Sequence, residues 1–73
     1  MKGIVKNVVA NRNFGFIRCS GVEYFFHRDD FTGFWPDLVE DINAKAKVEV
    51  EFESQDSPKG PRAINVRRTD YPN

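Results

Sequence analysis

Aromatic and basic side chains are concentrated in one stretch of the chain, NRNFGFIRCSGVEYFFHRDD, residues 11–30. Phe14 and Phe16 are separated by a single glycine, and Phe25 and His27 have the same spacing. Successive side chains on a β-strand point to opposite faces, so each pair lies on one face of its strand. Exposed aromatic rings flanked by cations stack on unpaired bases, and each stack contributes about 1–3 kcal/mol to binding. The residue types and spacing therefore indicate a surface for single-stranded nucleic acid.

A hairpin of two strands must position these side chains. The runs Phe14–Cys19 and Val22–His27 are predicted strands, and Ser20-Gly21 between them is a tight-turn signal. Both faces of this hairpin are apolar, and because one of them must meet the interior, the aromatic pairs are expected on the other. Three cations are expected around the outward rings: Lys6, Arg12 and Arg18. In an alternative that stays open, the following connection covers the rings or they form a dimer interface.

Shorter β-rich runs separated by turn residues make up most of the remaining chain. Strands are predicted at Gly3–Ala10, Lys47–Glu53 and Ala63–Arg68, with turns at residues 11–13 and 54–61. Residues 28–46 lose the alternation and contain Gly33 and Pro36. This segment is therefore predicted to be a long loop with a helical turn near residues 38–42.

Five short strands, one long connection and no long helix are typical of a small all-β barrel. A closed barrel also removes sheet edges, which a chain of 73 residues has little other structure to cover. We therefore expect a five-stranded antiparallel barrel over residues 1–69 and a frayed tail at residues 70–73. The side chains expected to fill its interior are Val5, Ile17, Cys19, Phe26, Val48, Val50, Phe52, Ile64 and Val66.

The charge pattern is uneven although the formal net charge is zero. Residues 1–28 carry a net charge of +4, residues 29–56 of −7 and residues 57–73 of +3. Such asymmetry can give a neutral molecule one basic and one acidic face, and the local potential then steers a charged ligand. The alternative is that these charges are solvated side chains scattered over the surface.

Several classes of function find no support in the residue pattern. Cys19 is the only cysteine and His27 the only histidine, so neither a disulfide nor a metal site is expected. Asp29 and Asp30 are adjacent carboxylates without a nucleophile or base beside them, so we expect no enzyme and no cofactor. The chain shows no signal peptide or membrane span, and a single cysteine suits a reducing compartment, which predicts a cytoplasmic protein.

Four motifs occur in the order and approximate spacing of the cold-shock domain family: KGIVK at Lys2–Lys6, FGFI at Phe14–Ile17, FFH at Phe25–His27 and KGPRAINV at Lys59–Val66. The resemblance implies an OB-fold barrel that binds single-stranded RNA or DNA with little sequence preference. It also implies RNA rather than DNA as the main ligand and a role as an RNA chaperone or regulator. The resemblance also implies that Phe14, Phe16, Phe25 and His27 stack on bases, while Lys6 and Arg12 approach phosphates.

The chain departs from the family pattern at three aromatic positions. The family usually has Lys-Trp-Phe-Asn on its first strand, whereas this chain has Asn7 and Val8 after Lys6. Arg28 replaces the phenylalanine that follows the motif histidine. Three lost stacking contacts predict weaker binding, although Asn7 and Arg28 can hydrogen-bond to bases or phosphates and arginine can stack.

Further binding residues are expected outside the two motif strands, Phe14–Cys19 and Val22–His27. Gly33-Phe34 resembles a Gly-Phe contact of the family, and Trp35 beside it either replaces a lost stack or caps the barrel. Lys59 and Arg62 either approach phosphates or belong to a Pro-Gly turn with solvated charges. The full set of candidate binding residues is Lys6, Asn7, Arg12, Phe14, Phe16, Arg18, Phe25, His27, Arg28, Phe34, Trp35, Lys59 and Arg62.

A second function remains open at this level. The tryptophan of the family pattern is missing from the first strand, and the net charge is zero. Both features favour a protein-interaction or homodimerising domain that has lost strong nucleic-acid binding. Such a domain would keep the barrel and use the same aromatic face for a partner.

Overall fold

The computed structural model describes residues 1–69, and the expected tail at residues 70–73 lies outside them. The described chain contains six β-strands, one α-helix and two short 3-10 helices. In chain order they are β1 (Lys2–Val9), η1 (Ala10–Arg12), β2 (Phe14–Cys19), β3 (Val22–His27), η2 (Arg28–Asp30), β4 (Phe31–Thr32), α1 (Trp35–Asn43), β5 (Glu49–Ser57) and β6 (Gly60–Arg68). The fold is therefore mainly β, as the sequence predicts.

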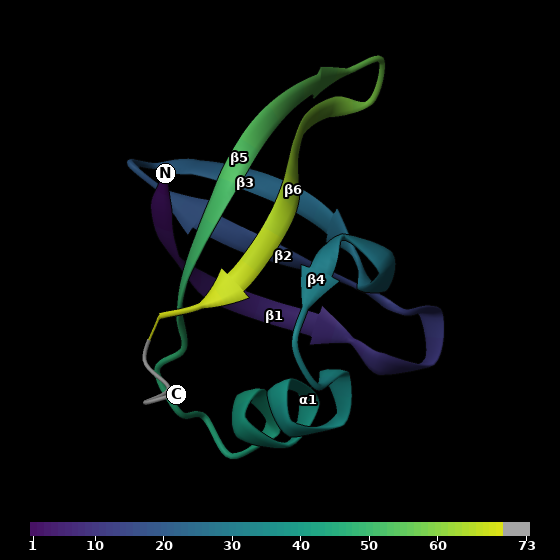
Figure 1. The fold of residues 1–73 in the computed structure, drawn as a ribbon, viewed down its shortest axis with the longest axis vertical. Helices are drawn as coiled ribbons and strands as arrows, with labels where there is room; N and C mark the ends of the chain where they lie inside the picture. The colour runs from purple at the N-terminus through teal and green to yellow at the C-terminus, as the bar shows by residue number, and fades with distance from the viewer. Residues whose placement is uncertain (70–73) are drawn as a thin grey trace.

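Five of the strands close into a barrel. They are hydrogen-bonded in the order β3-β2-β1-β5-β6, and a parallel pairing of Phe25 in β3 with Arg62 in β6 closes the circle. The short strand β4 pairs with β6 and lies outside this circle (Figure 1). The expected five-stranded barrel is confirmed, with antiparallel pairs and one parallel closing pair, β3–β6. The additional strand β4 also pairs with β6 in parallel.

The β2–β3 hairpin has the bounds that the sequence predicts. Ser20 and Gly21 between the strands have φ of 52° and 80°, the left-handed backbone that two-residue hairpin turns favour. At Gly15 of β2, a Cβ atom would lie 2.7 Å from the Asn7 carbonyl oxygen and 2.9 Å from the Phe26 ring. Glycine at this position therefore allows β1, β2 and the core to pack closely.

A β-bulge at Lys6 bends β1. The pairing of β1 with β2 shifts after Val5, so Lys6 is an extra residue and Asn7 pairs with Phe16. A bulge changes the direction of the side chains that follow it. As a result Asn7 is exposed beside Phe16, while Val8 is partly buried against the core.

A second bulge, in β6, corrects one predicted core position. The register between β5 and β6 shifts near Asn65, which has φ of 51°. This irregularity places Ala63 and Val66 on the inner face, where both are fully buried. The predicted core residue Ile64 is instead half-buried, because the extra residue interrupts the strict alternation of faces.

The segment between β3 and β5 is structured, and the prediction of a long loop is wrong. It contains η2, β4 and the nine-residue helix α1, where the sequence pattern predicts only a helical turn. Apolar side chains that recur at helical spacing pack into or against the core: Trp35, Leu38, Val39 and Ile42. Burial of this face stabilises the helix. Pro36 lies in the first turn, where its missing N–H breaks no helical hydrogen bond.

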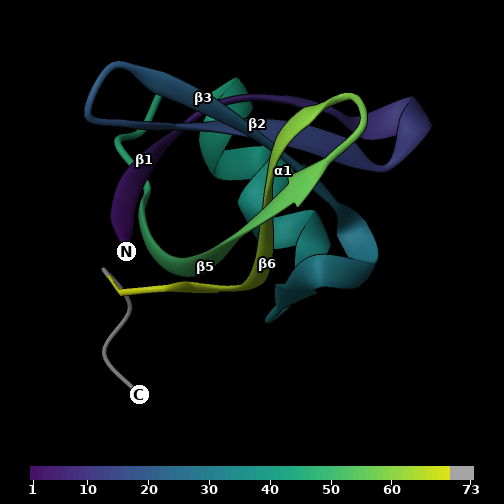
Figure 2. The same ribbon diagram turned by 90° about the horizontal axis from the view of Figure 1, so that it is seen from above.

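The β5–β6 hairpin is longer than the sequence predicts. β5 continues to Ser57 and β6 begins at Gly60, so the turn predicted at residues 54–61 is limited to Pro58-Lys59. The Ser57 hydroxyl donates a hydrogen bond of 2.6 Å to the Gly60 carbonyl oxygen across this turn. In Figure 1 the hairpin tip extends beyond the barrel at the end away from α1, and Figure 2 shows it next to β2 and β3.

The barrel interior and the inner side of α1 form one hydrophobic core. Its buried members are Val5, Ile17, Tyr24, Phe26, Phe31, Trp35, Leu38, Val48, Val50, Phe52, Ala63 and Val66. Most predicted interior residues are among them, and Cys19 packs against this core while half-buried. Within residues 1–69, no helix is long and apolar enough to cross a membrane.

Candidate nucleic-acid interface

Three phenylalanine rings cluster on the outer face of the β2–β3 hairpin, and we call them the aromatic surface: Phe14, Phe16 and Phe25. Ring centroids lie 5.3 Å apart for Phe14 and Phe25, 5.8 Å for Phe14 and Phe16, and 6.0 Å for Phe16 and Phe25. The direct pairing of Phe16 with Phe25 across the hairpin sets this arrangement. All three residues are half-buried. The rings therefore support one another and keep accessible surface for a ligand.

His27 extends the aromatic surface at the end of β3, where it pairs with Phe14. Its Nδ1 accepts a hydrogen bond of 3.1 Å from the backbone N–H of Asp29 and so caps η2. A neutral imidazole that accepts at Nδ1 carries its proton at Nε2. The His27 side chain is 39% exposed, so this Nε2–H can donate to a base or a phosphate.

The two residues of β1 that follow the bulge, Asn7 and Val8, have different environments. Asn7 lies beside Phe16, where its amide can meet a ligand. Val8 pairs with Gly15 and packs against the core. In this chain Val8 therefore contributes to core packing, and Asn7 is the residue of the pair that meets the outer face.

Two of the predicted cations share one carboxylate. Lys6 Nζ lies 2.6 Å and Arg18 Nη2 lies 3.1 Å from Glu23 Oε2. Hydrogen bonds from Lys6, which contributes most, and from Arg18 lower the pKa of Glu23 below its ordinary value. The carboxylate is therefore ionised at neutral pH, and a phosphate must displace it to bind either cation.

Three other predicted cations have no ion pair within residues 1–69. Arg12 lies in η1 and Arg28 in η2, the segments that flank the two motif strands. The backbone N–H of Arg28 donates to the Asn13 carbonyl oxygen at 2.7 Å, which holds η1 and η2 together. Lys59 lies at the turn of the β5–β6 hairpin. These cations are available to a phosphate backbone without breaking an ion pair.

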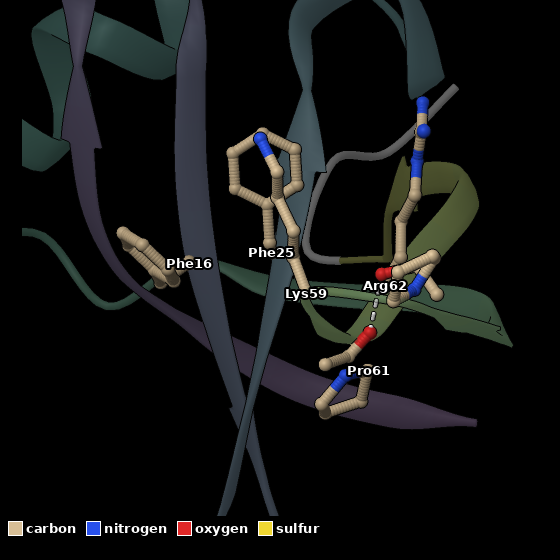
Figure 3. Close-up of a pocket in the computed structure, with 8 residues that line it drawn as sticks. Phe16, Phe25, Lys59, Pro61 and Arg62 are labelled. Carbon is tan, nitrogen blue, oxygen red and sulfur yellow. Dashed lines mark hydrogen bonds between the residues drawn. The ribbon is translucent and has the colours of Figure 1, made fainter.

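A groove of about 590 Å³ lies between the aromatic surface and the tip of the β5–β6 hairpin, and we call it the hairpin groove. Phe16 and Phe25 line one side, and Ser57–Arg62 line the other. Figure 3 shows Phe25 between Phe16 and the extended side chain of Arg62. The volume is within the range of protein pockets that hold small ligands.

Lys59 and Arg62 on the hairpin side of the groove are predicted from the sequence, but the strand pairing that places them there is not. The pattern SQDSPKGP indicates a turn, yet residues 54–57 pair with residues 60–63 and bring Pro58 and Pro61 to the groove. Strand pairing depends on backbone hydrogen bonds, and the polar side chains of residues 54–57 show no alternation that would reveal it. Pro58 and Pro61, which flank Lys59-Gly60, are the one local signal of apolar surface at this turn.

Phe34 and Trp35 are neighbours in the sequence with opposite environments. Phe34 is 66% exposed before α1, and within residues 1–69 its ring has no contact with the aromatic surface. Trp35 is 6% exposed, and its ring packs edge-on against Phe26 at 5.9 Å and Phe31 at 6.0 Å. Trp35 therefore caps the barrel interior, and the alternative in which it stacks on a ligand is wrong for this structure.

The protein-family model described as the 'Cold-shock' DNA-binding domain matches residues 1–69 of the chain. The chain belongs to the cold-shock domain family. Cold-shock domains bind single-stranded nucleic acids and are not known as enzymes. No curated protein matches the chain.

As a cold-shock domain, this chain keeps the aromatic rings of β2 and β3 and differs in what surrounds them. Asn7 and Arg28 stand where the family pattern has aromatic residues, and Glu23 offsets one of the two positive charges of Lys6 and Arg18. Within residues 1–69, no group of three or more histidine, cysteine, aspartate and glutamate side chains is placed to hold a metal ion. The side chains described at this site offer stacking, hydrogen bonding and cation–phosphate contact.

Proposed function

We propose that this cold-shock domain binds single-stranded nucleic acid, RNA rather than DNA, by stacking bases on the aromatic surface. The observation that carries the proposal is the mutual contact of three accessible phenylalanine rings on the outer face of one hairpin. Contiguous exposed apolar patches on small proteins mark interaction sites. Every base has a π-face, so stacking accepts many sequences. In this proposal His27 extends the stacking surface, Phe34 offers a separate exposed ring, and Asn7 offers its amide to a base edge.

Arg12, Arg28 and Lys59 are the cations that we assign to the phosphates. For a single strand, the logarithm of the affinity falls with the logarithm of salt concentration by about 0.7 per neutralised phosphate. Three contacts therefore give a slope of about −2. Lys6 and Arg18 contribute less, because Glu23 already holds them.

The role that we propose is that of an RNA chaperone or regulator in the cytoplasm. A protein that binds unpaired bases shifts the equilibrium of a structured strand toward its unpaired form by mass action. Stacking that does not require one sequence suits this task. Unpaired segments of different RNAs all present bases, but the base sequence differs from one RNA to another.

Fluorescence anisotropy of labelled strands tests the proposal. Oligoribonucleotides and oligodeoxyribonucleotides of the same sequence are titrated with the protein at two salt concentrations. Phe16→Ala and Phe25→Ala should each weaken binding by about five- to 150-fold, because each removes one stacking ring. Val22→Ala is the matched control, since Val22 is an exposed apolar residue of β3 outside the aromatic surface. Absence of binding to every strand by the folded protein would end the proposal.

A protein partner or a second copy of the chain is the other candidate for the aromatic surface. The pairing of Lys6 and Arg18 with Glu23 lowers the positive potential near the rings, which favours a ligand without phosphates. Sedimentation over a range of protein concentrations separates the two functions. A mass that rises with concentration and returns to that of a monomer in Phe16→Ala supports the homodimer, whereas a constant monomer that binds strands supports the first proposal.

A further inference from the structure

Arg62 borders the hairpin groove on the side away from Phe16 (Figure 3). It is the direct partner of Phe25 in the pair that closes the barrel. Side chains of directly paired residues share one face of a sheet and lie close together. A base stacked on Phe25 would therefore place one edge near the guanidinium group of Arg62.

Asp30 holds the Arg62 side chain in position. Asp30 Oδ2 accepts hydrogen bonds from Arg62 Nη2 at 2.8 Å and from Arg62 Nε at 3.2 Å. The same oxygen accepts a hydrogen bond of 3.1 Å from the backbone N–H of His27, so the carboxylate is itself fixed to the end of β3. The Asp30 side chain is 14% exposed and the Arg62 side chain is 38% exposed, so Asp30 is shielded while the Arg62 side chain keeps accessible surface.

The contact with Asp30 leaves part of the guanidinium available. It uses the Nε and Nη2 donors, and Arg62 retains the N–H groups of the Nη1–Nη2 side. Two parallel donors match guanine, which presents the acceptors O6 and N7 on one edge. Adenine presents one acceptor and one donor there, cytosine a donor, and thymine or uracil a single carbonyl acceptor. In unpaired strands this edge is free to be recognised.

We propose that Arg62, positioned by Asp30, selects guanine as the base that occupies the hairpin groove. The inference rests on the proposed function, because it requires a base stacked on Phe25. Arg62 contacts the base in this arrangement, and Asp30 is a positioning residue. The preference concerns one position of the bound strand, since bases on the rest of the aromatic surface meet rings rather than a fixed pair of donors.

Anisotropy titrations with short oligouridine strands that carry one central guanine, adenine or 7-deazaguanine test the inference. The last base keeps the shape of guanine and lacks the N7 acceptor. The wild-type protein should bind the guanine strand about fivefold more tightly than the adenine strand. A fivefold preference is at the lower end of the discrimination that a bidentate contact to a base provides, because the Arg62 side chain is partly exposed. The 7-deazaguanine strand should lose most of that advantage without any change to the protein.

Two variants and a matched control assign the preference to named residues. Arg62→Lys keeps the charge but loses the fork of donors, and Asp30→Asn keeps the shape but loses the charge that holds Arg62. Both should reduce the guanine preference to about twofold or less while binding to plain oligouridine persists. Arg67→Lys is the control, because Arg67 lies on the same strand and makes the same two-donor contact, to Glu51, outside the groove.

Each outcome bears on the inference. Equal binding of the three strands by the wild-type protein overturns it and leaves the proposed function standing. A preference that Arg67→Lys loses as readily as Arg62→Lys also overturns it, since the effect is then not specific to the groove. Failure of every strand to bind removes the proposed function and the inference together.

Discussion

The two faces of the β2–β3 hairpin have similar compositions and opposite environments. On the inner face, Ile17 and Phe26 are completely buried and Tyr24 is nearly so. On the outer face, Phe16 and Phe25 are half-buried and pack against each other. Alternation along a strand separates the two sets of side chains, but closure of the barrel decides which set meets the core.

Aromatic content alone does not identify a binding surface on this hairpin. Phe25 and Phe26 are adjacent and of the same type, yet Phe26 packs between β2, Phe31 and Trp35 while Phe25 borders the hairpin groove. The inner ring has exchanged water for core contacts, which stabilises the fold. The outer ring keeps accessible surface, which a ligand can cover. One hairpin therefore serves stability with one face and, in our proposal, binding with the other.

Replacing the two adjacent rings should give the largest difference. Phe26→Ala should lower the free energy of unfolding by about 3–5 kcal/mol, because it leaves a cavity in the core. Phe25→Ala should lower it by about 1 kcal/mol or less, because its ring is partly exposed. Urea denaturation measures both values, and the buried Trp35 provides the fluorescence signal. Equal losses in the two variants would mean that the outer ring belongs to the core, and the aromatic surface would then not be free for a ligand.

Phe34 and Trp35 offer a second contrast of the same kind. Trp35→Phe should destabilise the domain by about 1–3 kcal/mol, because the indole caps the barrel interior. It should leave the affinity for single-stranded nucleic acid unchanged. Phe34→Ala should change stability by about 0.5 kcal/mol or less and weaken binding by about fivefold, if the exposed ring stacks as proposed. Thermal melts and anisotropy titrations of both variants measure these effects. A Phe34→Ala protein with full affinity would limit stacking to the hairpin.

The smallest effect is expected where a carboxylate competes with the ligand. Glu23→Gln should release Lys6 and Arg18, tighten binding at low salt and steepen the salt slope by about 0.7 for each cation that gains a phosphate. Glu51→Gln is the matched control, because it releases Arg67 on β6 outside the groove. Salt titrations of both variants measure the slopes. An unchanged slope in Glu23→Gln would show that these two cations do not reach the strand.

The same carboxylate sets a dependence on pH. Hydrogen bonds from Lys6 and Arg18 lower the pKa of Glu23 below its ordinary value of 4.5. The pairing is therefore fully present above that pH and is lost only as the pH falls through the lowered pKa. The affinity of the wild-type protein for single strands should approach that of Glu23→Gln only as the pH falls through the lowered pKa of Glu23, and the two proteins should differ at pH 7. Anisotropy titrations over this range check the convergence.

Local sequence by itself determined the two motif strands, their turn and the chemistry that their outer face can offer. The β-rich runs Phe14–Cys19 and Val22–His27 and the turn signal at Ser20-Gly21 predict the hairpin without knowledge of the rest of the fold. These features depend on side-chain direction and turn geometry, which are set within a few residues. The same reasoning places Val48, Val50 and Phe52 in the core, and the structure confirms them there.

The tertiary structure alone decided the features that depend on distant segments. Burial of one face turns residues 35–43 into a helix and makes Trp35 a core residue, although Gly33 and Pro36 suggest a loop. The bulge near Asn65 exchanges Ile64 for Ala63 in the core, because register is fixed by the partner strand. Contacts across the closed barrel likewise create the hairpin groove and bring Asp30 to Arg62, residues separated by 32 positions in the sequence. Pairing and burial between distant residues are collective, so no short pattern in the chain encodes them.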